Sequence, residues 1–66
     1  MDRQDTILIL TWYKNRNRLK AETMDTIGDA ESAQRYRDMA DWFAEAIKRE
    51  EALMEKGEGK EDGTVR

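Results

Sequence analysis

Cysteine, histidine and proline are absent from this chain of 66 residues. Without cysteine there are no disulfides, and without cysteine and histidine the usual ligand sets for zinc and non-haem iron are missing. The serine–histidine and cysteine–histidine nucleophile arrangements are excluded for the same reason. No acidic loop has the spacing of an EF-hand calcium site. We therefore expect a protein that is not an enzyme and that uses neither a cofactor nor a metal ion.

Long apolar runs and a surplus of basic residues are missing as well. The longest aliphatic run, Ile7–Leu10, is far too short to cross a bilayer. The formal net charge is −3, from 12 basic and 15 acidic residues, which argues against a dedicated nucleic-acid-binding protein. No signal-peptide pattern is present, so we expect a cytoplasmic protein.

The chain is also short for a stable fold. Below roughly 70–80 residues, a single hydrophobic core seldom contributes more than about 3–5 kcal/mol. Small proteins that lack disulfides and metals commonly cover their apolar surface with another chain. We therefore expect a homo-oligomer, most simply a dimer, or a complex with a larger protein.

The clearest pattern lies in residues 36–54, where apolar side chains recur every three or four positions. This spacing is typical of a helix with one buried side. The central line is Ala33, Tyr36, Ala40, Phe43, Ile47, Glu50 and Met54, and Met39, Trp42, Ala46 and Leu53 widen it. The apolar arc is broader than one neighbouring helix needs, which indicates a second contact. Glu50 is expected either to pair with Arg16 across an interface or to meet water.

A first helix is predicted over residues 2–27, with Asp2 or Asp5 as its N-cap. Its buried side is expected to consist of Leu8, Ile9, Trp12 and Leu19, broadened by Ile7 and Leu10. The segment Thr6–Tyr13 is also rich in residues that favour strands. A strand stays open as the alternative, because periodicity alone cannot assign a short apolar run.

Gly28 and Asp29 predict the connection between the helices. A glycine just after a helix commonly adopts the left-handed C-cap conformation, and Asp29 can cap a second helix over residues 30–56. So short a loop predicts an all-α antiparallel hairpin in residues 1–56. Two hairpins are expected to pair into a homodimeric four-helix bundle. The charged, glycine-rich residues 57–66 predict a flexible, disordered tail.

The margin of the second helix supplies the candidate partner-binding residues. Trp42 is the strongest candidate for an exposed anchor, because tryptophan is enriched at binding hot spots. Phe43 and Tyr36 are expected in the core, with Trp12 packed inside the hairpin and Tyr13 outside. The predicted site consists of Trp42, Met39, Leu53 and Tyr13, flanked by Asp38, Asp41 and Glu45. It predicts a small protein-binding module, such as an inhibitor or adaptor, that docks an amphipathic helix face on a protein partner.

Two alternative functions remain open. The basic residues Lys14, Arg16 and Arg18 are candidates for contact with an anion or nucleotide, although a solvated segment is the ordinary role of such a run. If Thr6–Tyr13 were a strand, the order strand–helix–helix would resemble a ribbon-helix-helix DNA-binding regulator. That strand, however, carries no basic or amide side chain to read bases.

The run WFAEAIKR at residues 42–49 resembles the last helix of phage-encoded cyclic-oligonucleotide sponge proteins. That helix carries a tryptophan followed five residues later by isoleucine in an alanine-rich setting, as Trp42 and Ile47 do here. The resemblance covers this one helix, and the upstream sequence departs from the pattern. It implies a cyclic-nucleotide sponge, with a pocket at a subunit interface, as an alternative function. In general style, the chain also looks like small accessory proteins of phages and mobile elements.

Overall fold

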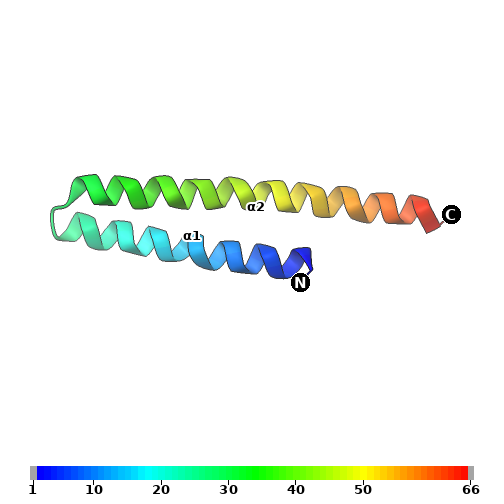
Figure 1. The fold of residues 1–66 in the computed structure, drawn as a ribbon, viewed down its shortest axis with the longest axis horizontal. Coiled ribbons are helices and arrows are strands. Elements are labelled where there is room, and N and C mark those ends of the chain that lie inside the picture. Colours follow the sequence, from blue (N-terminus) through cyan, green and yellow to red (C-terminus); the bar gives the residue numbers. More distant parts are fainter. Residues whose placement is uncertain (1, 66) are drawn as a thin grey trace.

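The protein forms a helical hairpin in the computed structural model, which describes the backbone of residues 2–65 and the side chains of residues 2–56. Helix α1 (Arg3–Thr26) and helix α2 (Ala30–Val65) run antiparallel and side by side (Figure 1). Residues 2–65 contain no strand, so the strand alternative for Thr6–Tyr13 is wrong. The all-α hairpin predicted from the sequence is confirmed.

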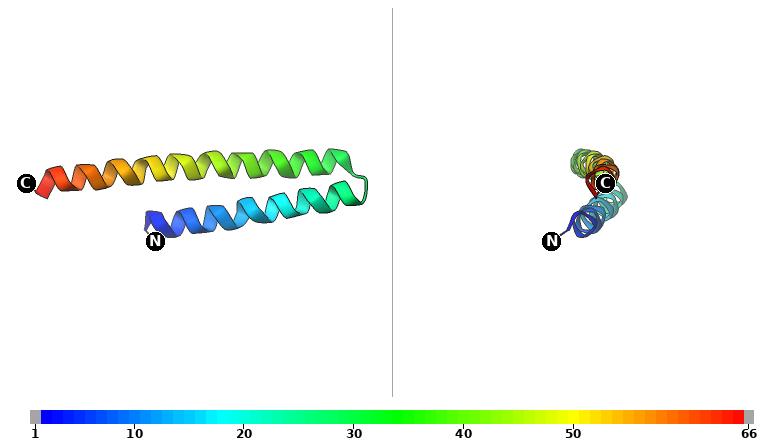
Figure 2. Two further views of the ribbon diagram at one scale, coloured as in Figure 1. Left: turned by 180° about the vertical axis from the view of Figure 1, so that it is seen from behind. Right: turned by 90° about the vertical axis from the view of Figure 1, so that its right-hand side faces the viewer.

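The hairpin is long and thin, with extents of 59 × 16 × 12 Å. Its radius of gyration of 16.3 Å exceeds the ~11 Å expected for a compact domain of this length. The cause is visible in the left-hand view of Figure 2, where α2 extends well past the N-terminus of α1. The backbone of α2 continues beyond the expected end at residue 56. The flexibility predicted for residues 57–66, whose side chains lie outside the described part of the chain, stays a prediction.

The two helices are joined by a tight turn at residues 27–29. The Gly28 N–H donates to the carbonyl oxygen of Asp25 (3.1 Å), and the Asp29 N–H donates to that of Met24 (2.8 Å). This pair of bonds is the Schellman motif, which needs a left-handed residue at its centre. Gly28 supplies it with φ +85°. Gly28 therefore closes α1 as predicted.

The same turn also starts α2. Asp29 Oδ1 accepts a hydrogen bond of 3.0 Å from the Ser32 N–H, so Asp29 is the predicted N-cap. This backbone hydrogen bond, helped by the Ser32 side chain and by Arg35, holds the pKa of Asp29 below its ordinary value. At the start of α1, Asp2 Oδ1 accepts from the Asp5 N–H at 2.9 Å, which identifies Asp2 as the N-cap there.

The helices meet along a seam with coiled-coil spacing. On α1, one line of buried or half-buried residues alternates by three and four: Ile7, Leu10, Lys14, Asn17, Ala21 and Met24. The matching line on α2 is Ala33, Tyr36, Ala40, Phe43, Ile47, Glu50 and Met54. Such alternation keeps one stripe of each helix facing the other. The line predicted on α2 is confirmed.

The buried side predicted for α1 is right for Ile7 and Leu10 and wrong for the other four residues. Leu8, Trp12 and Leu19 are 60%, 56% and 63% exposed, and Ile9 is exposed as well. Two polar residues, Asn17 and Lys14, lie in the observed seam. Asn17, only 7% exposed, donates its side-chain amide to the Tyr13 carbonyl oxygen one turn back (2.8 Å). Lys14 is half-buried, and a lysine can lay its alkyl chain along a seam while its ammonium group reaches water.

Alanine dominates the most deeply buried positions. Ala21, Ala33 and Ala40 are between 0% and 2% exposed, whereas no large side chain in residues 2–56 is fully buried. Small residues let two helices approach closely, but they remove little apolar area from water. The hairpin core is therefore thin, and most of the aromatic surface stays outside it.

Candidate protein-interaction surface

Four aromatic rings form a continuous row from α1 to α2. The centroids of Trp12 and Tyr13 are 5.0 Å apart with the rings nearly perpendicular, at 84°. Tyr13 stacks on Phe43 at 5.6 Å and 14°, which links the two helices. Phe43 in turn meets Trp42 edge-on at 5.1 Å and 81°. We call these four residues the aromatic row.

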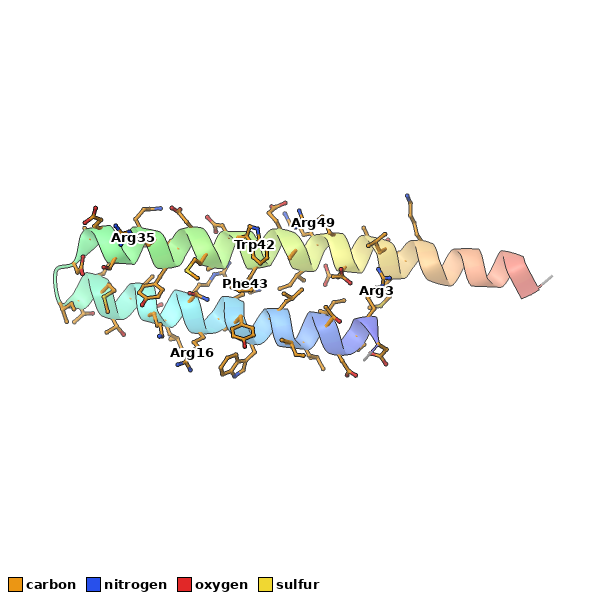
Figure 3. All side chains as sticks on the ribbon, viewed as in Figure 1. Arg3, Arg16, Arg35, Trp42, Phe43 and Arg49 are labelled. Carbon is orange, nitrogen blue, oxygen red and sulfur yellow. The ribbon has the colours of Figure 1, made fainter. Side chains whose placement is uncertain are left out.

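The aromatic row continues into an apolar stripe along α2. Met39, Trp42, Ala46 and Leu53 follow one another at spacings of three, four and seven residues, which places them on one side of the helix. Met39, Trp42 and Leu53 are 49%, 60% and 48% exposed. Figure 3 shows Trp42 on α2 and Phe43 turned toward α1. We call the aromatic row together with Met39, Ala46 and Leu53 the aromatic face.

Four of the predicted partner-binding residues belong to the aromatic face, namely Trp42, Met39, Leu53 and Tyr13. The prediction for Trp12 is wrong, because its side chain is 56% exposed rather than packed inside the hairpin. Tyr13 lies outside as predicted, 44% exposed, and it also stacks on Phe43 of α2. Tyr36 and Phe43 are only half-buried rather than enclosed in a core.

The three acidic residues predicted to flank the site do not lie together. Asp41 lines an open groove on the other side of the hairpin, together with Arg18, Glu22 and Arg37. Asp38 accepts a hydrogen bond of 2.9 Å from the Gln34 side chain, and Glu45 pairs with Lys48 at 3.9 Å. Asp38 and Glu45 lie one helical turn before and after Trp42, so these two form the acidic rim of the aromatic face.

The predicted anion-binding residues point in different directions. Lys14 is half-buried in the seam, and Arg18 lines the groove on the opposite side. The Arg16 guanidinium lies 5.3 Å from the centre of the Trp12 ring, and Lys20 lies 5.6 Å from that of Tyr36. A cation over an aromatic ring is attracted to its electron-rich face. Arg16 and Lys20 therefore border the aromatic face, but the three predicted basic residues do not converge on one ligand.

Ion pairs between the helices lie away from the aromatic row. Arg37 pairs with Asp25 on the side that carries the groove. At the open end of the hairpin, Glu50 lies 3.7 Å from Arg3, while Arg16 lies over Trp12. Within this hairpin, the acid on the apolar line is thus matched by a cation that sequence analysis did not identify.

A signal for the aromatic row was present in the sequence. Each helix carries two adjacent aromatics, Trp12–Tyr13 and Trp42–Phe43. With the turn centred on Gly28, residues equally far from it along the chain lie at the same level, and Tyr13 and Phe43 are each 15 positions away. Folding the sequence about Gly28 therefore brings these two rings opposite one another.

Among residues 2–56, no group of three or more acidic, cysteine or histidine side chains could hold a metal ion. Neither helix has, in its described part, a stretch long and apolar enough to span a membrane. Comparison with protein-family models, curated proteins and solved structures finds no match to this chain.

Proposed function

We propose that this hairpin is a small non-enzymatic protein-binding module that docks its aromatic face onto helices of a protein partner. The observation that carries the proposal is the aromatic row. Two tryptophans are more than half exposed, yet each is held in place by a ring contact to a neighbour. Large, preorganised aromatic side chains are typical anchors of protein interfaces, because they bury much area at little entropic cost.

The shape of the face supports a helical partner. Its α2 stripe runs from Met39 to Leu53, about 21 Å along the helix at 1.5 Å per residue. It is bordered by charged side chains of both signs, among them Arg35, Asp38, Glu45 and Arg49. Figure 3 shows Arg35 and Arg49 on α2, on either side of Trp42. An apolar stripe with a charged rim suits a helix-in-groove contact, in which the rim sets specificity.

The expected assembly is a four-helix bundle, which we propose as the form in which the face is covered. In the hairpin alone, three alanines are the most buried residues, and the large side chains Trp12, Trp42, Met39 and Leu53 stay about half exposed. Two further helices against the aromatic face would give those side chains a core. Such a bundle forms most simply from two hairpins as a homodimer.

The other functions considered for the sequence find less support. A cyclic-nucleotide sponge needs basic side chains that converge on a ligand, whereas Lys14, Arg16 and Arg18 lie on different sides. A ribbon-helix-helix regulator needs a strand before the first helix, and Thr6–Tyr13 belongs to α1. The protein-binding module is therefore the one function that we propose.

The proposal is tested with the tagged full chain and two variants, followed by native mass spectrometry of what co-purifies. Trp42→Ala removes the central anchor. Ile27→Ala is the matched control, because it removes a similarly exposed apolar side chain from the turn, away from the aromatic face. Loss of a hot-spot residue typically weakens binding by about 2 kcal/mol, roughly thirtyfold.

We expect a stoichiometric protein partner, which includes a second copy of the chain, with the wild type and Ile27→Ala, and its loss with Trp42→Ala. A chain that remains alone at all concentrations, or a partner held equally by all three proteins, would contradict the proposed function.

A further inference from the structure

The charged rim of the aromatic face differs between the two helices. On α1 it is basic, with Arg16 over Trp12 and Lys20 over Tyr36. On α2 the residues one turn before and after Trp42 are acidic, Asp38 and Glu45. Within the part of the chain that the structure describes, no carboxylate lies within ion-pair distance of Arg16 or Lys20, and Asp38 bonds only the neutral Gln34. The α1 edge thus presents two cations without a carboxylate partner, and the α2 edge presents one carboxylate without a cation, Asp38, next to the Glu31–Arg35 and Glu45–Lys48 pairs.

We propose that the occupant of the aromatic face is a second copy of this chain, related by a two-fold axis that runs parallel to the helices. This inference rests on the proposed function and names the partner of the same surface. In this arrangement, α1 of each copy packs against α2 of the other, and both turns lie at the same end of the bundle. A two-fold dimer requires a self-complementary surface, and a face with Arg16 and Lys20 on its α1 edge and Asp38 on its α2 edge meets that condition.

The level of each residue along the hairpin fixes which side chains would meet. Tyr13 faces Phe43, and Lys20 faces Tyr36. Two residues on α1 and α2 therefore lie at the same height along the hairpin, that is, level with each other, when their numbers add up to about 56. A two-fold axis along the helices leaves these levels unchanged. Asp38 of the second copy would then lie level with residue 18, between Arg16 and Lys20. Trp42 of the second copy would lie level with residue 14, beside the aromatic row.

The alternative two-fold axis, perpendicular to the helices, gives poorer electrostatics. α1 covers Arg3–Thr26, which is level with residues 30–53 of α2. Two hairpins that run in opposite directions overlap fully when the two-fold axis passes near the middle of this range, at Trp42. Arg35 and Arg49 lie seven residues before and after Trp42. Reversal would place these arginines of the two copies opposite each other, and like charges in that position are destabilising. Turns at the same end bring Arg35 of the second copy near Lys20, but they also place Asp38 between Arg16 and Lys20. Reversal brings the arginines together without that contact between opposite charges, so the balance of charges favours turns at the same end.

The area available is sufficient for a stable dimer. An aromatic side chain offers roughly 150–250 Å² of surface, and the two tryptophans leave more than half of theirs exposed. With Tyr13, Met39 and Leu53, the exposed apolar area is on the order of 500–600 Å² per copy. Two copies would bury about 1,000–1,200 Å² of apolar surface, to which the charged rim adds, and specific interfaces begin near this size.

Charge exchange tests the proposed pairing. Arg16→Glu and Asp38→Arg each place like charges at both α1–α2 contacts of the dimer, and we expect each variant alone to dimerise at least about tenfold more weakly in sedimentation experiments. In an equimolar mixture, the altered helices meet each other and the remaining contacts are native, so a heterodimer should form. Arg18→Glu is the matched control, because it makes the same charge change on the grooved side of the hairpin and should leave dimerisation unchanged.

The direction of the two copies is tested with a spin label. The chain has no cysteine, so Ile27→Cys, at an exposed position in the turn, gives one label per copy. Turns at the same end predict an inter-label distance below about 30 Å, a few helix diameters. Turns at opposite ends would be separated by about the length of α1, roughly 36 Å or more.

Dimerisation that is weakened by both charge variants, restored in their mixture and accompanied by the short distance would support the inference. A dimer that is insensitive to the charge changes, or that shows the long distance, would overturn it. A wild-type chain that stays monomeric at high concentration but binds a different protein through Trp42 would also overturn it, while leaving the proposed function intact.

Discussion

Phe43 and Trp42 are neighbours in the sequence, but we expect Phe43 to stabilise the hairpin and Trp42 to bind the partner. Alanine substitution of each residue can separate these two roles. Phe43 is half-buried, stacks on Tyr13 of α1 and meets Trp42 edge-on. Trp42 is 60% exposed, and its ring contact is to Phe43 on its own helix. Phe43 therefore joins the helices, whereas Trp42 points to whatever covers the aromatic face.

The magnitude follows from burial and ring contacts. Truncating a fully buried phenylalanine costs about 3–5 kcal/mol, and a half-buried one roughly half of that. Loss of the stacking contact across the hairpin adds about 0.5–1.5 kcal/mol. For Phe43→Ala we expect the free energy of unfolding to fall by about 2–4 kcal/mol. For Trp42→Ala in the monomer we expect a loss of about 1 kcal/mol or less, since most of its surface is already exposed.

The assay is urea unfolding followed by circular dichroism at 222 nm, at a chain concentration where sedimentation shows monomer only. The slope of the transition should be the same for all three proteins if the folded and unfolded states keep their exposed areas. Equal destabilisation by the two substitutions would refute the division of roles, and so would a loss below about 0.5 kcal/mol for Phe43→Ala.

Three further predictions concern the turn and the seam. Gly28→Ala should destabilise the hairpin by about 1–2 kcal/mol in the same assay, because φ is +85° there although no atom lies within 4 Å of the added Cβ; an unchanged midpoint would contradict the left-handed cap. Asp29→Asn should be less stable than the wild type at neutral pH and should converge with it in acid, measured by unfolding at a series of pH values. The pKa of Asp29 is lowered in the folded state, so its contribution is present above the unfolded-state pKa and is lost as the pH falls through the folded-state value. Ala40→Leu should cost about 1–3 kcal/mol, because Ala40 is 1% exposed at the seam; the exposed control Ala52→Leu should stay within about 0.5 kcal/mol, and equal effects would argue against close helix packing.

The parts of the fold that were predictable are those that depend on local chemistry. Gly28 and Asp29 determine the turn through a backbone angle and a capping hydrogen bond, neither of which needs knowledge of the rest of the fold. The buried side of α2 was predictable as well. Its apolar residues alternate by three and four over three heptads, from Ala33 to Met54, and this alternation identifies the side of α2 that packs on α1.

The buried side of α1 was not predictable from its own residues. Its large apolar side chains, Leu8, Trp12 and Leu19, suggest one side, but the helix uses another. The choice depends on α2, whose small residues Ala33 and Ala40 allow close contact with Ala21 near the turn. It also depends on the Asn17 amide, which satisfies its hydrogen bond within α1 and so tolerates burial.

The candidate site was predicted in part for the same reason. Trp42, Met39 and Leu53 share a stripe on α2, and the spacing along one helix is enough to group them. Phe43 was expected in a core because it lies on the central line of α2. That position does not reveal that the core is thin, which leaves Phe43 half-buried. Its role as the link between Tyr13 and Trp42 depends on the register of the two helices, which only the folded hairpin defines.

Hydroxyl-radical footprinting tests the role of the aromatic face most directly. The complex that co-purifies with the tagged chain, second copies included, is compared with the chain diluted until native mass spectrometry detects only monomer. We predict that Met39 and Trp42 are oxidised several-fold more slowly in the complex, while Ile27 in the turn, which is at least as exposed, reacts equally in both samples. Equal oxidation of Met39 and Trp42 in the two samples would contradict docking through the aromatic face.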